Sequence, residues 1–95
     1  MKRISFTQYG PVIGDRAIGE QLFNKLVEMC PKEEPIEIDL NGVESMATYC
    51  AKQIFGGLYK ELGAQKFGEN IVIKNATKNV QVIIRLGIQS VIESI

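Results

Sequence analysis

The first residues of the chain alternate between apolar and polar positions. In residues 2–8, Ile4 and Phe6 lie on one face and polar side chains on the other, which predicts a strand with one solvent-exposed face. The turn signal Tyr9-Gly10-Pro11 follows. We expect Val12-Ile13 to be a short second strand that pairs back on the first as a hairpin.

Two later stretches also predict strands. In residues 36–40, Ile36, Ile38 and Leu40 share one face. Residues 70–74 contain a continuous apolar run, Ile71-Val72-Ile73, which is typical of a strand that is buried on both faces.

Helical periodicity fills the remaining segments. A first helix is expected to follow Asp15, a good N-cap, and to stop before Pro31. A second runs from Ala47 to Leu62 with Gly63 after its end. The last follows Thr77, and its apolar positions recur at helical spacing. They are Val80, Ile83, Ile84, Gly87, Ile88, Val91 and Ile95. The adjacent Gly56 and Gly57 suggest that the second helix packs closely, in our interpretation against the sheet.

The predicted order is therefore β-(β)-α-β-α-β-α. Alternating strands and helices with short links define the α/β class, here with a parallel or mixed sheet covered by amphipathic helices. At 95 residues the chain is expected to be one domain, 1–95. Function in such folds tends to lie at the carboxyl ends of the strands, where the 36–40 strand leads into the segment Asn41–Cys50.

Composition narrows the function classes. Eleven basic and eleven acidic residues give a net charge of +0, so no broad basic surface is available for nucleic acid. The basic start Met1-Lys2-Arg3 is not followed by the apolar run of a signal peptide, and no stretch of about 18 apolar residues predicts a membrane span. We therefore expect a cytoplasmic protein with no membrane partner.

The sequence offers few catalytic groups. It contains no histidine and two cysteines, Cys30 and Cys50, which excludes Ser-His and Cys-His pairs and a complete zinc site. No phosphate-binding glycine motif is present, and we expect no cofactor and no metal. One alternative is an enzyme or small-ligand site built from Cys50, Tyr49 and Asp39. Cys50 is more often a buried packing residue, and Asp39 more often accepts backbone N–H bonds from the turn after Asn41.

Thr48 stands at or near the first turn of the second helix. A hydroxyl there has two uses: it can cap the helix, which is worth about 1 kcal/mol, or it can carry a phosphate, which helix N-termini stabilise. Spacing favours the cap and leaves both uses open.

Two segments carry a resemblance to a known family. IEIDLNGVESMATYCAKQIFGGL and, after it, GENIVIKNATKNVQVIIRLGI resemble the STAS-like family of small bacterial proteins and, more distantly, the STAS domains of anti-sigma-factor antagonists. Gly14-Asp15-Arg16 matches the family's Gly and Arg before its first helix. The resemblance covers roughly residues 10–92. It implies a STAS-like fold and a non-enzymatic, regulatory, protein-binding module.

The resemblance also implies a partner and a modification. STAS antagonists bind an anti-sigma factor that is a histidine-kinase-like ATPase, and this kinase phosphorylates a Ser or Thr at the start of the helix after the strand. Thr48 occupies that acceptor position, although Ala47 and Cys50 stand where antagonists usually have Asp and Gly. The residues expected to contact the partner are Asp39, Asn41, Gly42, Ser45, Thr48, Tyr49, Lys52 and Gln53, with Lys60 on the same helix.

A third hypothesis is a structural homo-oligomer. Ile92 and Ile95 near the end of the last helix leave apolar surface that a second copy could cover.

Overall fold

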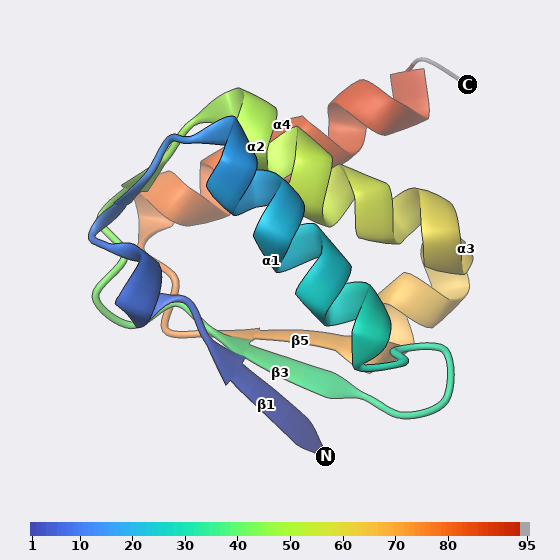
Figure 1. The fold of residues 1–95 in the computed structure, drawn as a ribbon. Coiled ribbons are helices and arrows are strands. Elements are labelled where there is room, and N and C mark those ends of the chain that lie inside the picture. The colour runs from blue at the N-terminus through green and yellow to red at the C-terminus, as the bar shows by residue number, and fades with distance from the viewer. Residues whose placement is uncertain (94–95) are drawn as a thin grey trace.

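Three parallel strands form the main sheet. The structure is a computed structural model that describes residues 1–93. β1 (Lys2–Ser5), β3 (Ile36–Asp39) and β5 (Ile71–Lys74) are paired in the order β1-β3-β5. All the helices lie on one side of this sheet (Figure 1), so the fold has two layers. The α/β class predicted from the sequence is confirmed.

The second strand does not form the expected hairpin. After the short turn of helix η1 (Thr7–Tyr9), β2 (Val12–Ile13) pairs in parallel with β4 (Ser45–Met46) in a separate two-stranded sheet. A hairpin needs β2 to run back along β1, whereas the turn leads the chain away from the main sheet. Every strand pairing in residues 1–93 is parallel, so the sheet is not mixed.

The first and last helices begin at the predicted caps. α1 (Arg16–Glu28) follows Asp15, whose carboxylate accepts a hydrogen bond from the Ala17 N–H at 2.7 Å. α4 (Lys78–Glu93) follows Thr77, whose Oγ1 accepts from the Val80 N–H at 3.1 Å. The predicted apolar stripe of α4 faces the core up to Val91, and Ile95 lies outside the described residues.

The middle helix is longer and less regular than predicted. It consists of α2 (Thr48–Ala51), a π-helical turn η2 (Lys52–Gly56) and α3 (Gly57–Asn70). Gly63 breaks it with φ 82° and ψ 163°, a conformation that glycine adopts readily but that is not the left-handed helical one expected for a C′ residue. The chain then returns to helix as far as Asn70. The prediction that Asn70 begins a strand is wrong.

β5 is not buried on both faces. It is an edge strand whose outer sheet face carries no helix, and Val72 and Ile73 are only half-buried. Because the main sheet has only three strands, the apolar run at this edge has one neighbour, β3. The continuous apolar pattern therefore predicted a strand correctly and its burial incorrectly.

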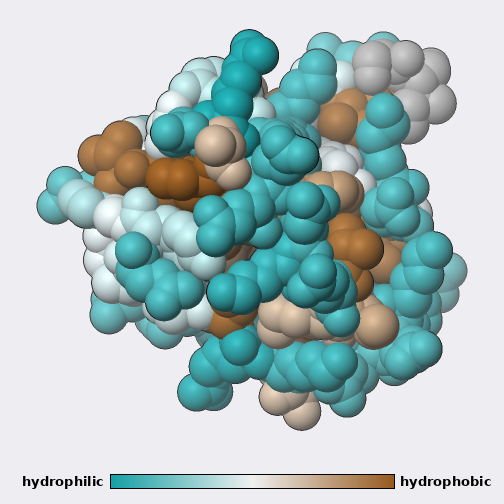
Figure 2. Space-filling view, in the orientation of Figure 1, coloured by the Kyte–Doolittle hydropathy of each residue, from teal (hydrophilic) through white to brown (hydrophobic). Residues whose placement is uncertain are grey.

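The core lies between the sheet and the helices. Ile36 and Ile38 of β3 are fully buried beneath the helices, and so are Leu22 and Leu26 of α1. The opposite side of α1 faces the viewer in Figure 2, where hydrophilic side chains predominate and apolar ones form small patches. This division is what the amphipathic pattern predicts.

Glycines allow the helices to cross at close range. A Cβ at Gly87 of α4 would lie 2.7 Å from the backbone C of Ala51 and from the backbone N of Lys52. A Cβ at Gly57 would lie 2.6 Å from the Phe23 ring of α1. Close packing was predicted for the pair of glycines in the middle helix, but against the sheet. The structure instead places helices against them.

Candidate functional site

A tight turn carries the chain away from the carboxyl end of β3. Leu40 and Val43 are buried and anchor the turn, and the Val43 N–H donates to the Leu40 carbonyl at 3.0 Å. Gly42 adopts φ 86°, which favours glycine, and a Cβ there would lie 3.3 Å from Thr7 Cγ2. The Asn-Gly pair is thus used for the geometry of this corner.

Asp39 organises the same corner through local hydrogen bonds. Its Oδ1 accepts from the Asn41 N–H at 2.9 Å, as the sequence predicted, and from Asn75 Nδ2 at 3.0 Å. The bond from Asn75, then the bond from Asn41, lowers the pKa of the Asp39 carboxyl. Sequence reasoning missed Asn75. It directly follows β5, so the rule that parallel strands end at one edge could have placed it beside Asp39.

The small sheet fixes where the second helix begins. The Pro11 carbonyl accepts from the N–H groups of Glu44 and Ser45, at 2.7 and 3.2 Å. The Ile13 carbonyl then accepts from the Ala47 N–H at 2.8 Å. Thr48, the next residue, is consequently held at a defined place.

Thr48 is exposed at the first position of α2. The N-cap is Ala47, and the Thr48 hydroxyl makes no hydrogen bond with residues 1–93. The prediction that this hydroxyl caps the helix is therefore wrong. It is wrong by one position, because the side chain that caps a helix start belongs to the N-cap residue and accepts from N–H groups further along the helix; here that residue is Ala47, which has no acceptor. The hydroxyl is left open to solvent.

Tyr49 is exposed but held in place. Its side chain is 45% exposed, its hydroxyl donates to the Gly14 carbonyl, and the Arg16 guanidinium carbon lies 5.3 Å from the ring centroid. A cation over an aromatic face is attracted by the ring quadrupole. These contacts join the start of α2 to the start of α1. The sequence placed Arg16 near a helix start but gave no sign of this pairing.

Lys52 and Gln53 continue this surface along the helix. A shallow cavity of about 350 Å³ is lined by Tyr49, Lys52, Gln53, Gly57, Lys60 and Val91, and a smaller one of about 210 Å³ by Arg16, Tyr49 and Gln53. The charged lining residues are all cationic. We call Arg16, Thr48, Tyr49, Lys52, Gln53 and Lys60 the α2 surface.

The predicted contact residues fall into two groups. Asp39, Asn41 and Gly42 lie at the carboxyl end of β3, whereas Thr48, Tyr49, Lys52 and Gln53 lie on the α2 surface. In Figure 1, β3 is in the sheet layer and α2 is at the far side of the helix layer. Ser45, half-buried in β4, lies along the chain between them. The single contact patch implied by the sequence is therefore divided.

Cys50 is a packing residue. It is fully buried, and its Sγ lies 3.5 Å from the Asp15 carbonyl oxygen. Burial, and next the Asp15 charge, raises the pKa of the Cys50 thiol. The Cys50 and Tyr49 side chains contact residues 14 and 15, whereas Asp39 bonds Asn41 and Asn75. The alternative site from Cys50, Tyr49 and Asp39 is not assembled.

The described part of the chain has neither a metal-binding cluster nor a helix that could span a membrane. Within residues 1–93, no three acidic or cysteine side chains are grouped so that they could hold a metal ion. None of the helices found there combines the length and the apolar character that crossing a bilayer requires.

Comparison with known proteins places the chain in a family. A family model described as the STAS-like domain of unknown function (DUF4325) matches residues 19–81. This is most of the chain, so the protein belongs to that STAS-like family, as the resemblance of the β3–α2 segment indicated. No curated protein and no solved structure gives a significant match. The matched range contains all of the α2 surface except Arg16.

The hydrogen bond from Asn75 should contribute to the lowered pKa of Asp39. Asn75→Gly removes the amide and tolerates the positive φ of 61° at this position. We expect the Asp39 pKa to rise in this variant, measured by carbon-detected NMR titration. Because the folded pKa is lowered, the carboxylate stabilises the fold above its unfolded pKa, and this stabilisation is lost as the pH falls through the folded pKa. An unchanged Asp39 pKa would contradict the assignment.

The two cysteines should differ in reactivity. Cys30 is exposed and Cys50 is buried, so iodoacetamide at neutral pH should alkylate Cys30 at least about tenfold faster. Mass spectrometry of the digested protein gives both rates. Cys30→Ser isolates the Cys50 rate, which should increase only under denaturing conditions. Rapid and selective alkylation of Cys50 in the folded protein would revive the reactive-thiol alternative.

Proposed function

We propose that the protein is a non-enzymatic regulatory module that docks on a partner protein through the α2 surface. The observation that carries this proposal is Tyr49, an exposed aromatic side chain whose position is fixed by Gly14 and Arg16. Tyrosine and arginine are enriched at protein interfaces and among the residues that dominate binding energy. A side chain that is already ordered loses little entropy when it binds.

The shape of the surface favours a protein over a small molecule. The cavities beside Tyr49, of about 350 and 210 Å³, lie just above and below the lower limit of typical ligand pockets, about 300 Å³. Both are shallow features on the outer side of a helix. The fixed aromatic and the cations around it suit a broad contact with another protein.

Charge indicates the kind of partner surface. Arg16, Lys52 and Lys60 supply cations to the cavities, and no carboxylate lines either one. The complementary partner surface is acidic. By resemblance to STAS antagonists, we propose that the partner is a histidine-kinase-like ATPase that acts as an anti-sigma factor. Asp39, Asn41 and Gly42 then shape the corner below the interface and are not central contacts.

Phosphorylation of Thr48 is the proposed switch. The hydroxyl is exposed and has no hydrogen-bond partner in residues 1–93, so a kinase can reach it. A phosphate adds about two negative charges at pH 7. It would lie one helical turn from Lys52, reduce the positive charge of the surface and repel an acidic partner. Docking and phosphorylation would therefore exclude each other.

The other function classes have less support. A catalytic thiol requires an accessible, acidic Cys50, and this residue is buried with a raised pKa. A homo-oligomer would use the exposed apolar residues of α4, Val82, Leu86 and Ile92. These residues do not lie on the α2 surface, so oligomerisation would be compatible with the proposed docking.

Charge reversal on the α2 surface tests the docking. We expect Lys52→Glu to weaken binding to the histidine-kinase-like ATPase encoded nearest to this gene by about tenfold, because an attraction becomes a repulsion. Lys66→Glu, the same change at an exposed site on the far part of α3, is the matched control and should bind normally. Titration calorimetry measures both. Absence of wild-type binding, or equal losses in the two variants, would overturn the proposal.

The modification is tested with the same ATPase. Incubation with the kinase and ATP should add one phosphate to the wild-type protein, and peptide mapping should place it on Thr48. Thr48→Ala should remain unlabelled but still bind, while Thr48→Ser should be labelled. Labelling that persists in Thr48→Ala would remove Thr48 from the account and leave the docking surface unaffected.

A further inference from the structure

A second surface lies between the end of β5 and α4. A groove of about 710 Å³ is formed there by residues of both elements, and it is distinct from the α2 surface. Its lining residues are Ile73, Asn75, Ala76, Gln81, Ile84, Arg85, Ile88, Gln89 and Ile92. Five of these nine are apolar. The volume is about twice that of the larger cavity on the α2 surface.

The groove borders an unpaired sheet edge, to which it is joined through Ile73. β5 is the last strand of the main sheet and pairs only with β3. An edge strand presents a row of unpaired backbone groups to any extended chain that approaches it. The opposite edge, β1, carries the charged residues Lys2 and Arg3, which discourage pairing. β5 offers three consecutive apolar residues, Ile71, Val72 and Ile73, before its single cation Lys74, so of the two edges of the main sheet this one suits an added strand better.

The wall of the groove supplies pockets for side chains. Ile73 of β5 contributes from the sheet, and Ile84, Ile88 and Ile92 contribute from α4. Ile88 is half-buried and Ile92 is 48% exposed. Alternate residues of a strand added to β5 would point toward the helix layer, where these isoleucines could cover them.

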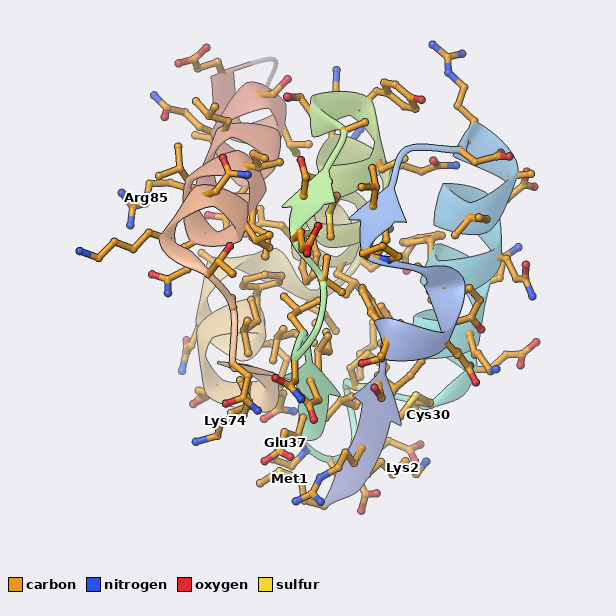
Figure 3. The ribbon with its side chains drawn as sticks, turned by 90° about the vertical axis from the view of Figure 1, so that its left-hand side faces the viewer. Met1, Lys2, Cys30, Glu37, Lys74 and Arg85 are labelled. Carbon is orange, nitrogen blue, oxygen red and sulfur yellow. The ribbon has the colours of Figure 1, made fainter. Side chains whose placement is uncertain are left out.

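The charge of the groove determines the occupant. Arg85 is its only charged lining residue, and Lys74 and Lys78 adjoin lining segments in the chain. Figure 3 shows Lys74 and Arg85 on the same side of the molecule. Two carboxylates are also close: Asp39 lies opposite Lys74 in the sheet register, and Glu93 accepts a hydrogen bond from the lining residue Gln89. Three cations against two carboxylates leave a weakly positive local charge. A second copy would place these cations against one another, whereas an acidic segment would be attracted.

We propose that this groove binds an extended segment of a partner protein, which adds a strand to the free edge of β5. The segment alternates apolar residues, which occupy the isoleucine-lined groove, with carboxylates, which pair with Arg85 and the neighbouring lysines. Main-chain hydrogen bonds provide binding, and the alternating side chains provide selectivity. The site would let the module hold a second partner while the α2 surface is occupied.

Synthetic peptides test both parts of this proposal. The probes are the acetylated, amidated peptide DIEVDIE, its basic counterpart KIKVKIK, and a DIEVDIE peptide that is N-methylated at alternate residues. In NMR titrations of the isotope-labelled protein, DIEVDIE should shift the amide signals of residues 71–74 and of Arg85 and Ile88. KIKVKIK should bind at least about tenfold more weakly because its charges are repelled. The N-methylated peptide should not bind, because it cannot pair with the edge.

A charge reversal at Arg85 distinguishes specific peptide binding from nonspecific association. Arg85→Glu should reduce binding of DIEVDIE and improve binding of KIKVKIK, while Lys66→Glu should change neither. Arg85 is exposed, so the variant is expected to fold. Equal binding of the N-methylated peptide, or no shift at β5 with millimolar DIEVDIE, would overturn the proposal. Concentration-dependent shifts of the same signals without peptide would show that the occupant is a second copy, which would also overturn it.

Discussion

The fold depends on one close contact, the crossing of α4 over the middle helix. At Gly87 the backbone of α4 approaches the backbone of the middle helix very closely. A Cβ on Gly87 would lie only 2.7 Å from the Ala51 backbone C and from the Lys52 backbone N. Gly56 of the middle helix is in close contact with α4 in the same way. A Cβ on Gly56 would lie 2.6 Å from Val91 Cγ2. The contact occurs where the helix widens into the π-helical turn. Small residues on both helices permit it, because a Cβ at Gly87 would collide with the backbone of the middle helix.

This contact supports the surface that we assign to partner binding. Lys52 belongs to the crossing through its backbone and to the α2 surface through its side chain. Thr48 and Tyr49 lie one turn before it, and Tyr49 is joined to the start of α1 by its hydrogen bond to the Gly14 carbonyl and its contact with Arg16. The exposed residues are therefore attached to the core from two directions. A preformed surface of this kind suits docking between folded proteins. The groove beside β5 is bordered by the opposite flank of α4, so one helix separates the two sites.

The sequence predicted what depends on local patterns. The sequence pattern identified three helices and the strands β1, β2, β3 and β5 but missed the short β4. Asp15 and Thr77 were placed correctly as caps because their role is local. Which elements pair or pack together was not predictable from the sequence. β2 pairs with β4, and the middle helix packs on other helices, because these contacts depend on the whole topology. At the site, Asp39 bonded locally as expected. Asn75, which bonds it across the sheet edge, could be found only by placing two strand ends together.

The unfolding free energy of Gly87→Ala tests the central contact most directly, with Gly68→Ala as the reference. Both glycines are helical, but a Cβ at Gly68 would meet nothing within 4 Å. Helix propensity alone would stabilise both variants, by up to about 1 kcal/mol. We predict in chemical denaturation that Gly68→Ala is neutral or stabilised and that Gly87→Ala loses about 2–3 kcal/mol through overpacking. A Gly87→Ala protein as stable as Gly68→Ala would show that the crossing does not hold the fold together.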